Sequence, residues 1–593
     1  MNNKIQFINI FSLFKFVSSK RKKQSVLLLL FACLSGLVEC LTVYSIIPFI
    51  DIFTNQLSDQ KNIFSVSYNY LFKENSIDFF IYTSFAFLII FSLTTFCKIS
   101  CLYFIGKLSA IMGSELGNKA YNSTIKLEFI DFSKSDKNSF ISDQVYKVHY
   151  LIEFILVPFF NTFYNAITIL FIVVILFFSN PYITLFLTLS LLVSYLLISY
   201  SVNKKITKNS STLINNQDLL IKLVRESISS IRIILLKNYQ NFFSMRQFQI
   251  DLLMRMSYVS NVFLSTFPRY IIEWFGIFIL IICSIFIMSS KSESVEFIST
   301  IGVFAFAAQR MLPSMQNLYN GFTNIKAYSS SLDRILFILS NYPIKKKLKK
   351  NCAQTNKSVS VRSIKFSNVH FEYEKNKNIY NKKIDLEIIK GDFIGVFGET
   401  GSGKSTFIDL MLGFLKPNSG NIFYDNKDIN LKTNSLFKTQ IQKTISHVPH
   451  SVFIADSSIK SNIAFGKKKE DINFDKIMHV LKIVKMHNKI LGTQEKLNLL
   501  IGEGGNKFST GQKQRIGIAR ALYDDFNILI LDEATSSLDV KTESAILEKI
   551  HKEYGKNSII VIVSHRKKSL IFCNKLIDYN QKLITLRKNK ITD

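Results

Sequence analysis

The sequence predicts two parts: an α-helical membrane domain with six spans, followed by an α/β domain built around a phosphate-binding loop. Three observations support this fold class. Six long apolar runs occupy residues 26–320 of the 593-residue chain. Near residue 341 the composition changes, and short β-branched segments begin to alternate with helical patterns. A glycine-rich motif that ends in Gly-Lys-Ser then begins at Gly398.

The composition agrees with a membrane protein and excludes several other classes. Hydrophobic residues make up 48% of the chain and charged residues 20%, which excludes global disorder. A mean hydropathy of +0.21 is high for a soluble protein of this length. The net charge of +30 divides into +16 before residue 356 and +14 after it. Because the excess is not gathered in one patch, we expect no nucleic-acid partner.

The six apolar runs are each close to, or above, the roughly 20 residues that a helix needs to cross the hydrocarbon core. They occupy 26–50, 78–106, 150–178, 182–201, 262–288 and 296–320. With the N-terminus inside, the outer loops carry three basic residues, whereas the inner segments 107–147 and 202–260 carry fifteen. The positive-inside rule therefore predicts that both termini are cytoplasmic. The length of these inner segments predicts that helices 2 to 5 extend beyond the bilayer into the cytoplasm.

The predicted domain boundaries follow the changes in composition. Residues 1–340 form the membrane domain, 341–360 a basic and polar linker, and 361–593 the α/β domain. The outer loop 51–77 is long and partly apolar. It predicts either an amphipathic element on the outer leaflet or a disordered loop.

The glycine-rich motif has the spacing and the context of a phosphate-binding loop. It comprises Gly398, Glu399, Thr400, Gly401, Ser402, Gly403, Lys404, Ser405 and Thr406. A strand-like segment, 393–397, precedes it, and a helical pattern follows. The glycines allow backbone N–H groups to surround phosphate oxygens at a helix N-terminus. Lys404 is expected to reach the β- and γ-phosphates of a nucleotide, and the Ser405 hydroxyl to bind Mg²⁺.

Two further strands predict the rest of a nucleotide-hydrolysing site. The apolar segment 527–531 ends in Asp532 and Glu533. Asp532 is placed to hold Mg²⁺ through water, and Glu533 to act as the base that polarises the attacking water. Another apolar strand, 558–563, ends at Ser564 and His565. If it runs parallel to the others, His565 lies at the phosphate edge of the sheet, where we expect it to contact the γ-phosphate.

The segment Lys507–Arg515 resembles the signature motif of ATP-binding cassette (ABC) proteins. Asp532 to Asp539 is similar to the Walker B motif and D-loop of that family, and Tyr373 precedes Gly398 by 25 residues, as the family's adenine-stacking aromatic does. Six helices followed by one cassette resembles a bacterial half-exporter of the type I exporter kind. The resemblance covers essentially the whole chain.

The resemblance implies a homodimer with two ATP molecules held between the cassettes. Lys404, Ser405, Asp532, Glu533 and His565 of one copy would face the signature residues of the other. These signature residues are Ser509, Gly511 and Gln512. The implied cofactors are ATP and Mg²⁺.

Two positions depart from the family's pattern. His450 follows Val448-Pro449 where the family usually has glutamine, and it is expected to contact ATP-bound Mg²⁺ or water. Thr510 replaces a signature glycine. Neither change removes the proposed base, so an active ATPase is expected, although coupling or the hydrolysis rate can differ.

The sequence of the membrane domain indicates the substrate less directly than the cassette motifs indicate the nucleotide. Polar side chains inside membrane spans are costly and usually functional. Arg310 is such a residue: it is expected either to bind a phosphate group of the substrate or to pair with Glu39 for structural reasons.

Stretches in the first span, in the second inner segment and around Arg310 resemble the PglK-type bacterial flippases of lipid-linked oligosaccharides. The resemblance implies a polyprenyl-pyrophosphate glycan, moved from the cytoplasmic to the outer face of a bacterial inner (plasma) membrane. A multidrug, peptide or other lipid exporter is the alternative. A soluble ABC ATPase that acts on DNA or ribosomes is excluded by the six predicted spans.

Overall fold

The computed structural model describes residues 2–46, 76–134, 137–289, 294–341, 360–373, 383–431, 434–487, 497–580, 583–584 and 586–588. Apart from their end residues, the outer loop 51–77 and the predicted linker 341–360 lie outside these ranges. The chain divides into two compact units. The first comprises Met1–Leu127 and Asp131–Lys347, and the second Glu128–Ile130 and Leu348–Asp593.

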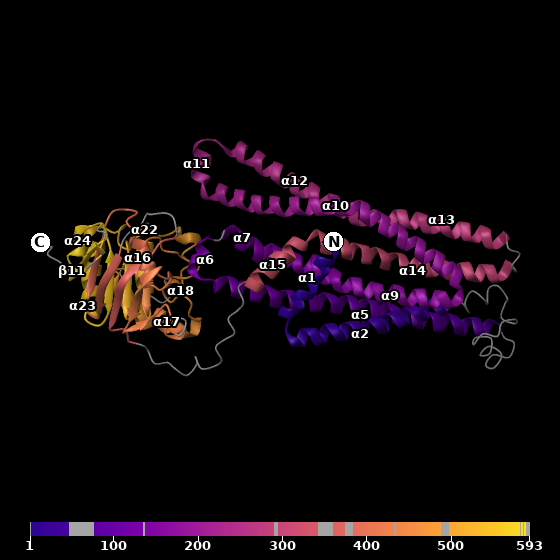
Figure 1. Ribbon diagram of the computed structural model, residues 1–593, viewed down its shortest axis with the longest axis horizontal. Coiled ribbons are helices and arrows are strands. Elements are labelled where there is room, and N and C mark those ends of the chain that lie inside the picture. The colour runs from indigo at the N-terminus through magenta and orange to yellow at the C-terminus, as the bar shows by residue number, and fades with distance from the viewer. Residues whose placement is uncertain are drawn as a thin grey trace. The chain divides into compact units, whose positions relative to one another are not determined.

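The first unit is helical, and its long helices lie side by side (Figure 1). They are α1 (Asn2–Phe16), α2 (Ser19–Tyr44), α5 (Ser76–Ile125), α9 (Val157–Ser179), α10 (Pro181–Ser229), α12 (Gln240–Thr266), α13 (Pro268–Ser289), α14 (Ser294–Ala327) and α15 (Ser329–Asn341). Shorter helices connect them: α6 (Phe129–Lys134), α7 (Lys137–Ser142), α8 (Val148–Leu151) and α11 (Ile231–Leu236), with π-helical turns at Asp143–Lys147 and Ile152–Leu156.

Four helical segments among the described residues are long and apolar enough to cross a membrane: Ser19–Tyr44, Phe80–Ile125, Ser139–Ser179 and Pro181–Ser229. The first contains residues 26–44 of the predicted span 26–50, and the other three contain all or nearly all of the predicted spans 78–106, 150–178 and 182–201. The predicted span at 262–288 is divided between α12 and α13 by a break at Phe267, and the span at 296–320 lies on α14. Some side chains of α13 and α14 lie outside the described set.

The helices α5 and α10 are much longer than a bilayer requires. They contain 50 and 49 residues, or about 75 Å each at a rise of about 1.5 Å per residue. The hydrocarbon core is only about 30 Å thick. Helices of this length agree with the predicted extensions beyond the membrane.

Glycines allow α9 to approach two neighbouring helices closely. A Cβ atom on Gly321 of α14 would lie 2.0 Å from the Thr162 hydroxyl oxygen of α9. A Cβ atom on Gly36 of α2 would lie 2.6 Å from the ring of Phe171, also on α9. Small residues of this kind bring membrane helices into close backbone contact. Helix α9 is therefore packed directly between α2 and α14.

The second unit is an α/β domain with two sheets (Figure 1). Its strands are β1 (Ser363–His370), β2 (Lys383–Ile389), β3 (Phe393–Phe397), β4 (Ser419–Tyr424), β5 (Lys427–Asp428), β6 (Ile445–Val448), β7 (Ile528–Asp532), β8 (Ile559–Val563), β9 (Lys575–Asp578), β10 (Leu583–Ile584) and β11 (Leu586–Lys588). Its helices are α16 (Lys404–Met411), α17 (Ser435–Gln442), α18 (Ile459–Ile463), α19 (Phe474–Ile483), α22 (Thr510–Tyr523), α23 (Val540–Tyr554) and α24 (Lys567–Leu570).

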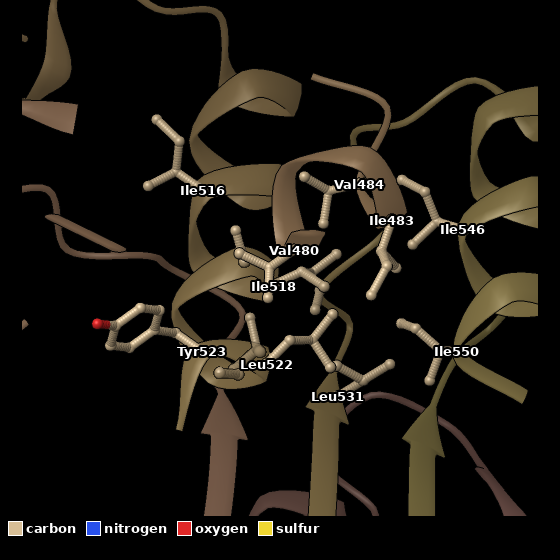
Figure 2. Close-up of a cluster of buried hydrophobic side chains, with 14 of the residues drawn as sticks. Val480, Ile483, Val484, Ile516, Ile518, Leu522, Tyr523, Leu531, Ile546 and Ile550 are labelled. Carbon is tan, nitrogen blue, oxygen red and sulfur yellow. The ribbon is translucent and has the colours of Figure 1, made fainter. Parts of the chain in front are cut away.

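The larger sheet has the strand order β11-β9-β3-β8-β7-β6, in which every neighbouring pair from β9 to β6 is parallel. The smaller sheet, β10-β2-β1-β4-β5, is mainly antiparallel. All five residues of β8 are buried, as expected for a parallel strand that is covered on both faces. Figure 2 shows one of these covers, in which apolar side chains of α19, α22 and α23 meet Leu531 of β7.

Three residues, Glu128 and the first two residues of α6, belong to the second unit. The ring of Phe129 stacks on Phe414 with a distance of 5.1 Å between the ring centroids. The next residue, Ile130, packs against the buried apolar cluster of the smaller sheet and α16. A short piece of the first half of the chain is thus part of the second core.

Candidate functional site

Four adjacent parallel strands end at one edge of the larger sheet, and each is followed by a predicted site residue or motif. The glycine-rich loop follows β3, and His565 follows β8. Asp532 ends β7 and Glu533 comes next, while His450 lies two residues after β6. Because β8 lies between β3 and β7, the predicted parallel arrangement of these three strands is present. This topology gathers residues that are up to 167 positions apart.

The glycine-rich loop has the backbone conformation that requires glycine. The φ angles of Gly401 and Gly403 are +82° and +105°, in the left-handed region. Gly403 is the N-cap of α16, so Lys404, Ser405 and Thr406 form the first turn of that helix. The Glu399 amide donates a hydrogen bond to the Asn580 side chain at 2.8 Å, which ties the loop to the segment after β9. The loop therefore ends at a helix N-terminus, where backbone N–H groups are free to bind an anion.

The ammonium group of Lys404 lies over this loop. Its Nζ donates hydrogen bonds to the carbonyl oxygens of Gly398 and Glu399 at 2.8 and 2.9 Å. Burial lowers the pKa of Lys404, although the carboxylates of Glu533 and Asp532 act in the opposite direction. A cation held against the glycine-rich loop is suited to bind phosphate oxygens.

Glu533 is held between two imidazoles. Its carboxylate lies 3.1 Å from His565 Nε2 and 3.5 Å from His450 Nε2. The backbone of Glu533 has a φ of +49°, which is uncommon for a residue with a side chain and often marks a functional position. Its amide donates to the Val563 carbonyl oxygen of β8 at 3.1 Å. The side chain is 26% exposed, so it is accessible at the sheet edge.

Two aspartates near Glu533 have pKa values above the usual range. Burial raises the pKa of Asp532, and the neighbouring Glu533 raises it further, while His450 and Lys404 partly offset this. Burial and the charge of Asp532 also raise the pKa of Asp409, on α16, to about 6. Asp532 and the exposed Ser405 offer hard oxygen donors, which fit Mg²⁺ better than a transition metal. The described residues contain no cluster of three or more His, Cys, Asp or Glu that could hold a metal by themselves.

Tyr373, the expected adenine-stacking residue, lies beside the glycine-rich loop. Its side chain is 52% exposed, and its hydroxyl is 3.4 Å from the Thr406 hydroxyl. The Phe371 ring packs edge-on against the Tyr373 ring at 4.9 Å and limits its orientation. An accessible aromatic ring in this position can stack on a base.

The signature residues lie at the N-terminus of α22 rather than at the strand ends. Ser509 is the N-cap and forms a reciprocal capping box with Gln512. Thr510, which replaces the usual glycine, is simply the first residue of the helix. Gly511 is required by packing, since a Cβ atom there would lie 3.0 Å from the Ser537 carbonyl oxygen.

Gln514 and Arg566 have structural roles that the sequence analysis did not identify. The buried Gln514 side chain, on α22, bonds the Ser536 hydroxyl and the Ser537 amide at 3.0 Å each. Arg566, next to His565, donates to the Ser536 and Leu538 carbonyl oxygens and to the buried Glu543. The loop after Glu533 is thus fixed from two sides. No motif identifies these contacts, because they join side chains to a loop backbone distant in sequence.

The first unit contains a cavity of about 670 Å³ between α5, α9 and α14. Its polar lining residues are Lys98, Asn161, Asn165, Thr168, Gln309, Arg310, Ser314, Asn317, Asn320 and Asn324. Phe91 and Phe306 are among its apolar lining residues. Polar side chains inside a membrane domain line a substrate path or a water-filled cavity far more often than they face lipid.

Arg310 lines the cavity and contacts Glu39, so the expected pairing with Glu39 is present, while phosphate binding stays a prediction. One guanidinium nitrogen is 3.5 Å from the Glu39 carboxylate. The guanidinium carbon lies 4.6 Å from the Phe91 ring centroid and 5.3 Å from that of Phe306. Glu39 is only 1% exposed and has a second partner, Lys98 Nζ, at 2.7 Å. Two cations and one carboxylate leave a net charge of +1 at this end of the cavity.

Both units match known families. Residues 25–311 match the model of the ABC transporter transmembrane region, and residues 381–536 match that of the ABC transporter. The chain resembles a solved bacterial Atm1-family ABC exporter with ATP bound at a TM-score of 0.74. That match has 16% identity and covers 95% of this chain and 94% of the other.

Curated relatives support the same assignment. An export ATP-binding/permease protein of Rickettsia conorii is 38% identical over 242 residues, or 41% of this chain and 40% of the relative. An ATP-dependent lipid A-core flippase of Wigglesworthia glossinidia brevipalpis is 37% identical over 36% of this chain and 38% of the relative. The matched segments thus span less than half the length of each relative. The predicted fold class is confirmed: one polypeptide carries an ABC transporter transmembrane region followed by an ABC transporter domain, with the fold of an ABC exporter.

Proposed function

We propose that Glu533 is the general base of ATP hydrolysis in this protein. The observation that supports the assignment is its place between His565 and His450 at the end of the four parallel strands. A carboxylate held by two imidazoles can accept a proton from a water molecule without moving far. His565 Nε2, at 3.1 Å, orients the carboxylate and lies where a γ-phosphate oxygen is expected.

The remaining cassette residues bind the nucleotide. The backbone of Gly398–Thr406 surrounds the phosphates, Lys404 exchanges its two carbonyl contacts for phosphate oxygens, and Tyr373 stacks on adenine. The Ser405 hydroxyl and the Asp532 carboxylate hold Mg²⁺, which supplies positive charge to the phosphates when bound. His450, 3.5 Å from Glu533, would contact Mg²⁺ or water at this edge of the sheet.

The functional unit in this proposal is a homodimer. One chain has one cassette, and its signature residues Ser509, Gly511 and Gln512 lie at a helix N-terminus apart from the strand ends. Helix α22 has 14 residues, and the N-terminus of such a helix is suited to a phosphate group. In a head-to-tail pair, the partner's signature helix would complete the ATP site of each copy.

We assign the cavity of the membrane domain to the substrate, and propose a lipid-linked oligosaccharide or a related glycolipid. A net positive charge beside Arg310 favours a phosphate or pyrophosphate, which a guanidinium binds through two parallel hydrogen bonds. The wider cavity is polar enough for a hydrated head group, and a lipid tail can remain in the bilayer. The resemblance to a lipid A-core flippase agrees with a large amphiphilic substrate. A multidrug, peptide or other lipid substrate is the alternative.

In this proposal, the substrate moves from the cytoplasmic to the outer face of a bacterial inner membrane. Both termini and the cassette are then cytoplasmic, as the distribution of basic residues requires. ATP from the cytoplasm drives the movement.

Reconstitution in proteoliposomes with a fluorescent lipid-linked oligosaccharide tests this function. We expect ATP-dependent flipping by the wild-type protein, and loss of both flipping and ATP hydrolysis in Lys404→Ala. Arg310→Ala is expected to lower flipping about tenfold while basal ATP hydrolysis continues. The matched control is Arg269→Ala, because Arg269 is an exposed arginine of α13 paired with Glu273. Transport of a drug but not of the glycolipid by the wild-type protein would refute the substrate and leave the ATPase assignment intact.

A further inference from the structure

Every asparagine on α9 and α14 lines the cavity of the membrane domain. They are Asn161 and Asn165 on α9, and Asn317, Asn320 and Asn324 on α14. We call these five side chains the amide wall. Their spacings of four, three and four residues place each set on one helix face. An overall richness in asparagine does not explain this distribution, since it would place amides on the lipid-facing sides as well.

Packing within the domain does not use most of these amides. Among the described residues, no side-chain hydrogen bond is present for Asn317, which is exposed, or for Asn324, which is half-buried. The Oδ1 atom of Asn161 is buried without a hydrogen-bond partner. Asn320 accepts a hydrogen bond from Gln316 at 2.9 Å, and Asn165 donates to the Asn161 carbonyl oxygen at 2.7 Å. The buried, unpaired oxygen of Asn161 is costly, so a ligand that donates a hydrogen bond to it would be favoured. The Asn317 and Asn324 amides are accessible to the same ligand.

The amide wall lies at a distance from the charged end of the cavity. Along α14, Asn317 is seven residues and Asn324 fourteen residues beyond Arg310. At a rise of about 1.5 Å per residue, these positions are about 10 and 21 Å along the helix axis. A ligand that occupies both ends would have an anionic group near Arg310 and a neutral, polar portion of sugar size or larger near the asparagines.

We propose that the amide wall binds the hydroxyl groups of a carbohydrate, and that it distinguishes a glycosylated lipid pyrophosphate from the bare lipid pyrophosphate. This inference rests on the proposed function, because it assigns the second half of the same substrate. Each amide offers a donor and an acceptor, and each sugar hydroxyl offers both in return. A site built to hydrogen-bond hydroxyl groups rejects a ligand that lacks them, since its own polar groups then lose their partners.

Equilibrium binding to the full-length protein in lipid nanodiscs tests the inference with three probes. They are farnesyl pyrophosphate, farnesyl pyrophosphate that bears one N-acetylglucosamine, and the same sugar pyrophosphate without the farnesyl chain. In the wild-type protein we expect the glycosylated lipid to bind about tenfold more tightly than the bare lipid. The water-soluble sugar pyrophosphate should bind more weakly than the glycosylated lipid.

The double variant Asn317→Leu/Asn324→Leu should reduce the affinity ratio of the two lipids to about one. Its affinity for the bare lipid should remain unchanged, which also shows that the cavity is still folded. The milder Asn317→Ser should give an intermediate ratio. Asn215→Leu is the matched control, because Asn215 is an exposed asparagine of α10 outside the cavity, and it should retain the wild-type ratio.

The outcomes separate this inference from the function on which it rests. Equal binding of the two lipids by the wild-type protein would overturn the role of the amide wall and leave the lipid substrate in place. Binding of neither lipid would overturn the substrate assignment itself. If the sugar pyrophosphate without its lipid bound as tightly as the glycosylated lipid, the proposal that the ligand is attached to a lipid would be wrong.

Discussion

Each unit of the molecule holds a glutamate between two basic side chains, but the two glutamates differ in exposure and in the kind of partner. Glu533 of the cassette is 26% exposed and lies between His565 and His450. Glu39 of the membrane domain is 1% exposed and lies between Lys98 and Arg310. Imidazoles can be neutral near pH 7, whereas arginine stays charged and lysine usually does.

The difference between the partners separates a base from a counter-ion. A carboxylate at an open edge of the sheet is accessible to water, from which it can accept a proton. A carboxylate buried between two cations instead compensates their charge, and its removal leaves them unpaired. The comparison supports the proposed role of Glu533 in proton transfer and suggests that Glu39 controls the charge of the cavity.

The largest expected effect comes from replacing each of the two glutamates by glutamine. The two variants should differ strongly in ATP turnover. We expect Glu533→Gln to lower ATP turnover by about 100-fold or more, because the amide cannot accept a proton, while ATP binding is retained. Glu39→Gln should leave basal ATP turnover within about twofold and alter glycolipid transport instead. Phosphate release and flipping, measured on the same proteoliposomes, check both. The comparison breaks if Glu39→Gln stops hydrolysis while Glu533→Gln does not.

A third imidazole in the cassette lacks a carboxylate partner and so sharpens the comparison. His447 of β6 is partly buried, its Nε2 has no hydrogen-bond partner among the described residues, and burial lowers its pKa from 6.5 to about 4. Below pH 6.5 the unfolded chain binds the proton and the folded chain does not, so stability falls as the pH is lowered towards 4. The expected loss between pH 7 and pH 5 is about 2 kcal/mol.

His447→Gln should remove this pH dependence, because glutamine does not titrate. Thermal unfolding of the cassette in the full-length protein, followed from pH 7 to pH 5, measures the difference between the variants. His479→Gln is a matched control: His479 is exposed and paired with Glu553, and its replacement should leave the slope nearly unchanged. An identical slope in wild type and His447→Gln would contradict the assignment.

The two imidazoles around Glu533 should contribute unequally, and this is the smallest expected effect. His565, at 3.1 Å, is closer than His450, at 3.5 Å, and it follows the strand between β3 and β7. We expect His565→Ala to lower kcat about tenfold or more and His450→Ala only about threefold, with smaller changes in KM for ATP. His450→Gln restores the usual residue of the family and should recover most of the rate. A greater loss in His450→Ala than in His565→Ala would reverse the order.

The cassette site could be predicted in detail from the sequence because its groups lie at the ends of consecutive apolar strands. Gly398–Thr406, Asp532, Glu533 and His565 are each recognised by a local pattern, and parallel pairing then brings the strand ends together. What the sequence did not predict is how the loop after Glu533 is fixed. Gln514 and Arg566 bond its backbone from positions that no local pattern connects to it.

The membrane cavity was predictable only in part. The cost of charge in an apolar span identified Arg310 and Glu39 as candidates, and the structure places them 3.5 Å apart. The same cost identified Lys98, but its pairing with Glu39 was not predicted. That pairing and the position of the amide wall depend on how the helices of the membrane domain face one another. The predicted spans at 262–288 and 296–320 lie on helices α12 to α14, but the break at Phe267 within the first of them was not predicted.

The sequence by itself determined the class of this protein: the apolar runs require a membrane, and the glycine-rich loop requires a nucleotide phosphate. Both conclusions rest on local chemistry. The length of an apolar run, and the range of φ angles open to glycine, do not depend on distant residues. Only the tertiary structure decided which partners surround Glu39 and which side chains line the cavity. Those depend on the rotation and close approach of helices, which residues such as Gly36 and Gly321 permit, and which helical periodicity within one segment does not specify.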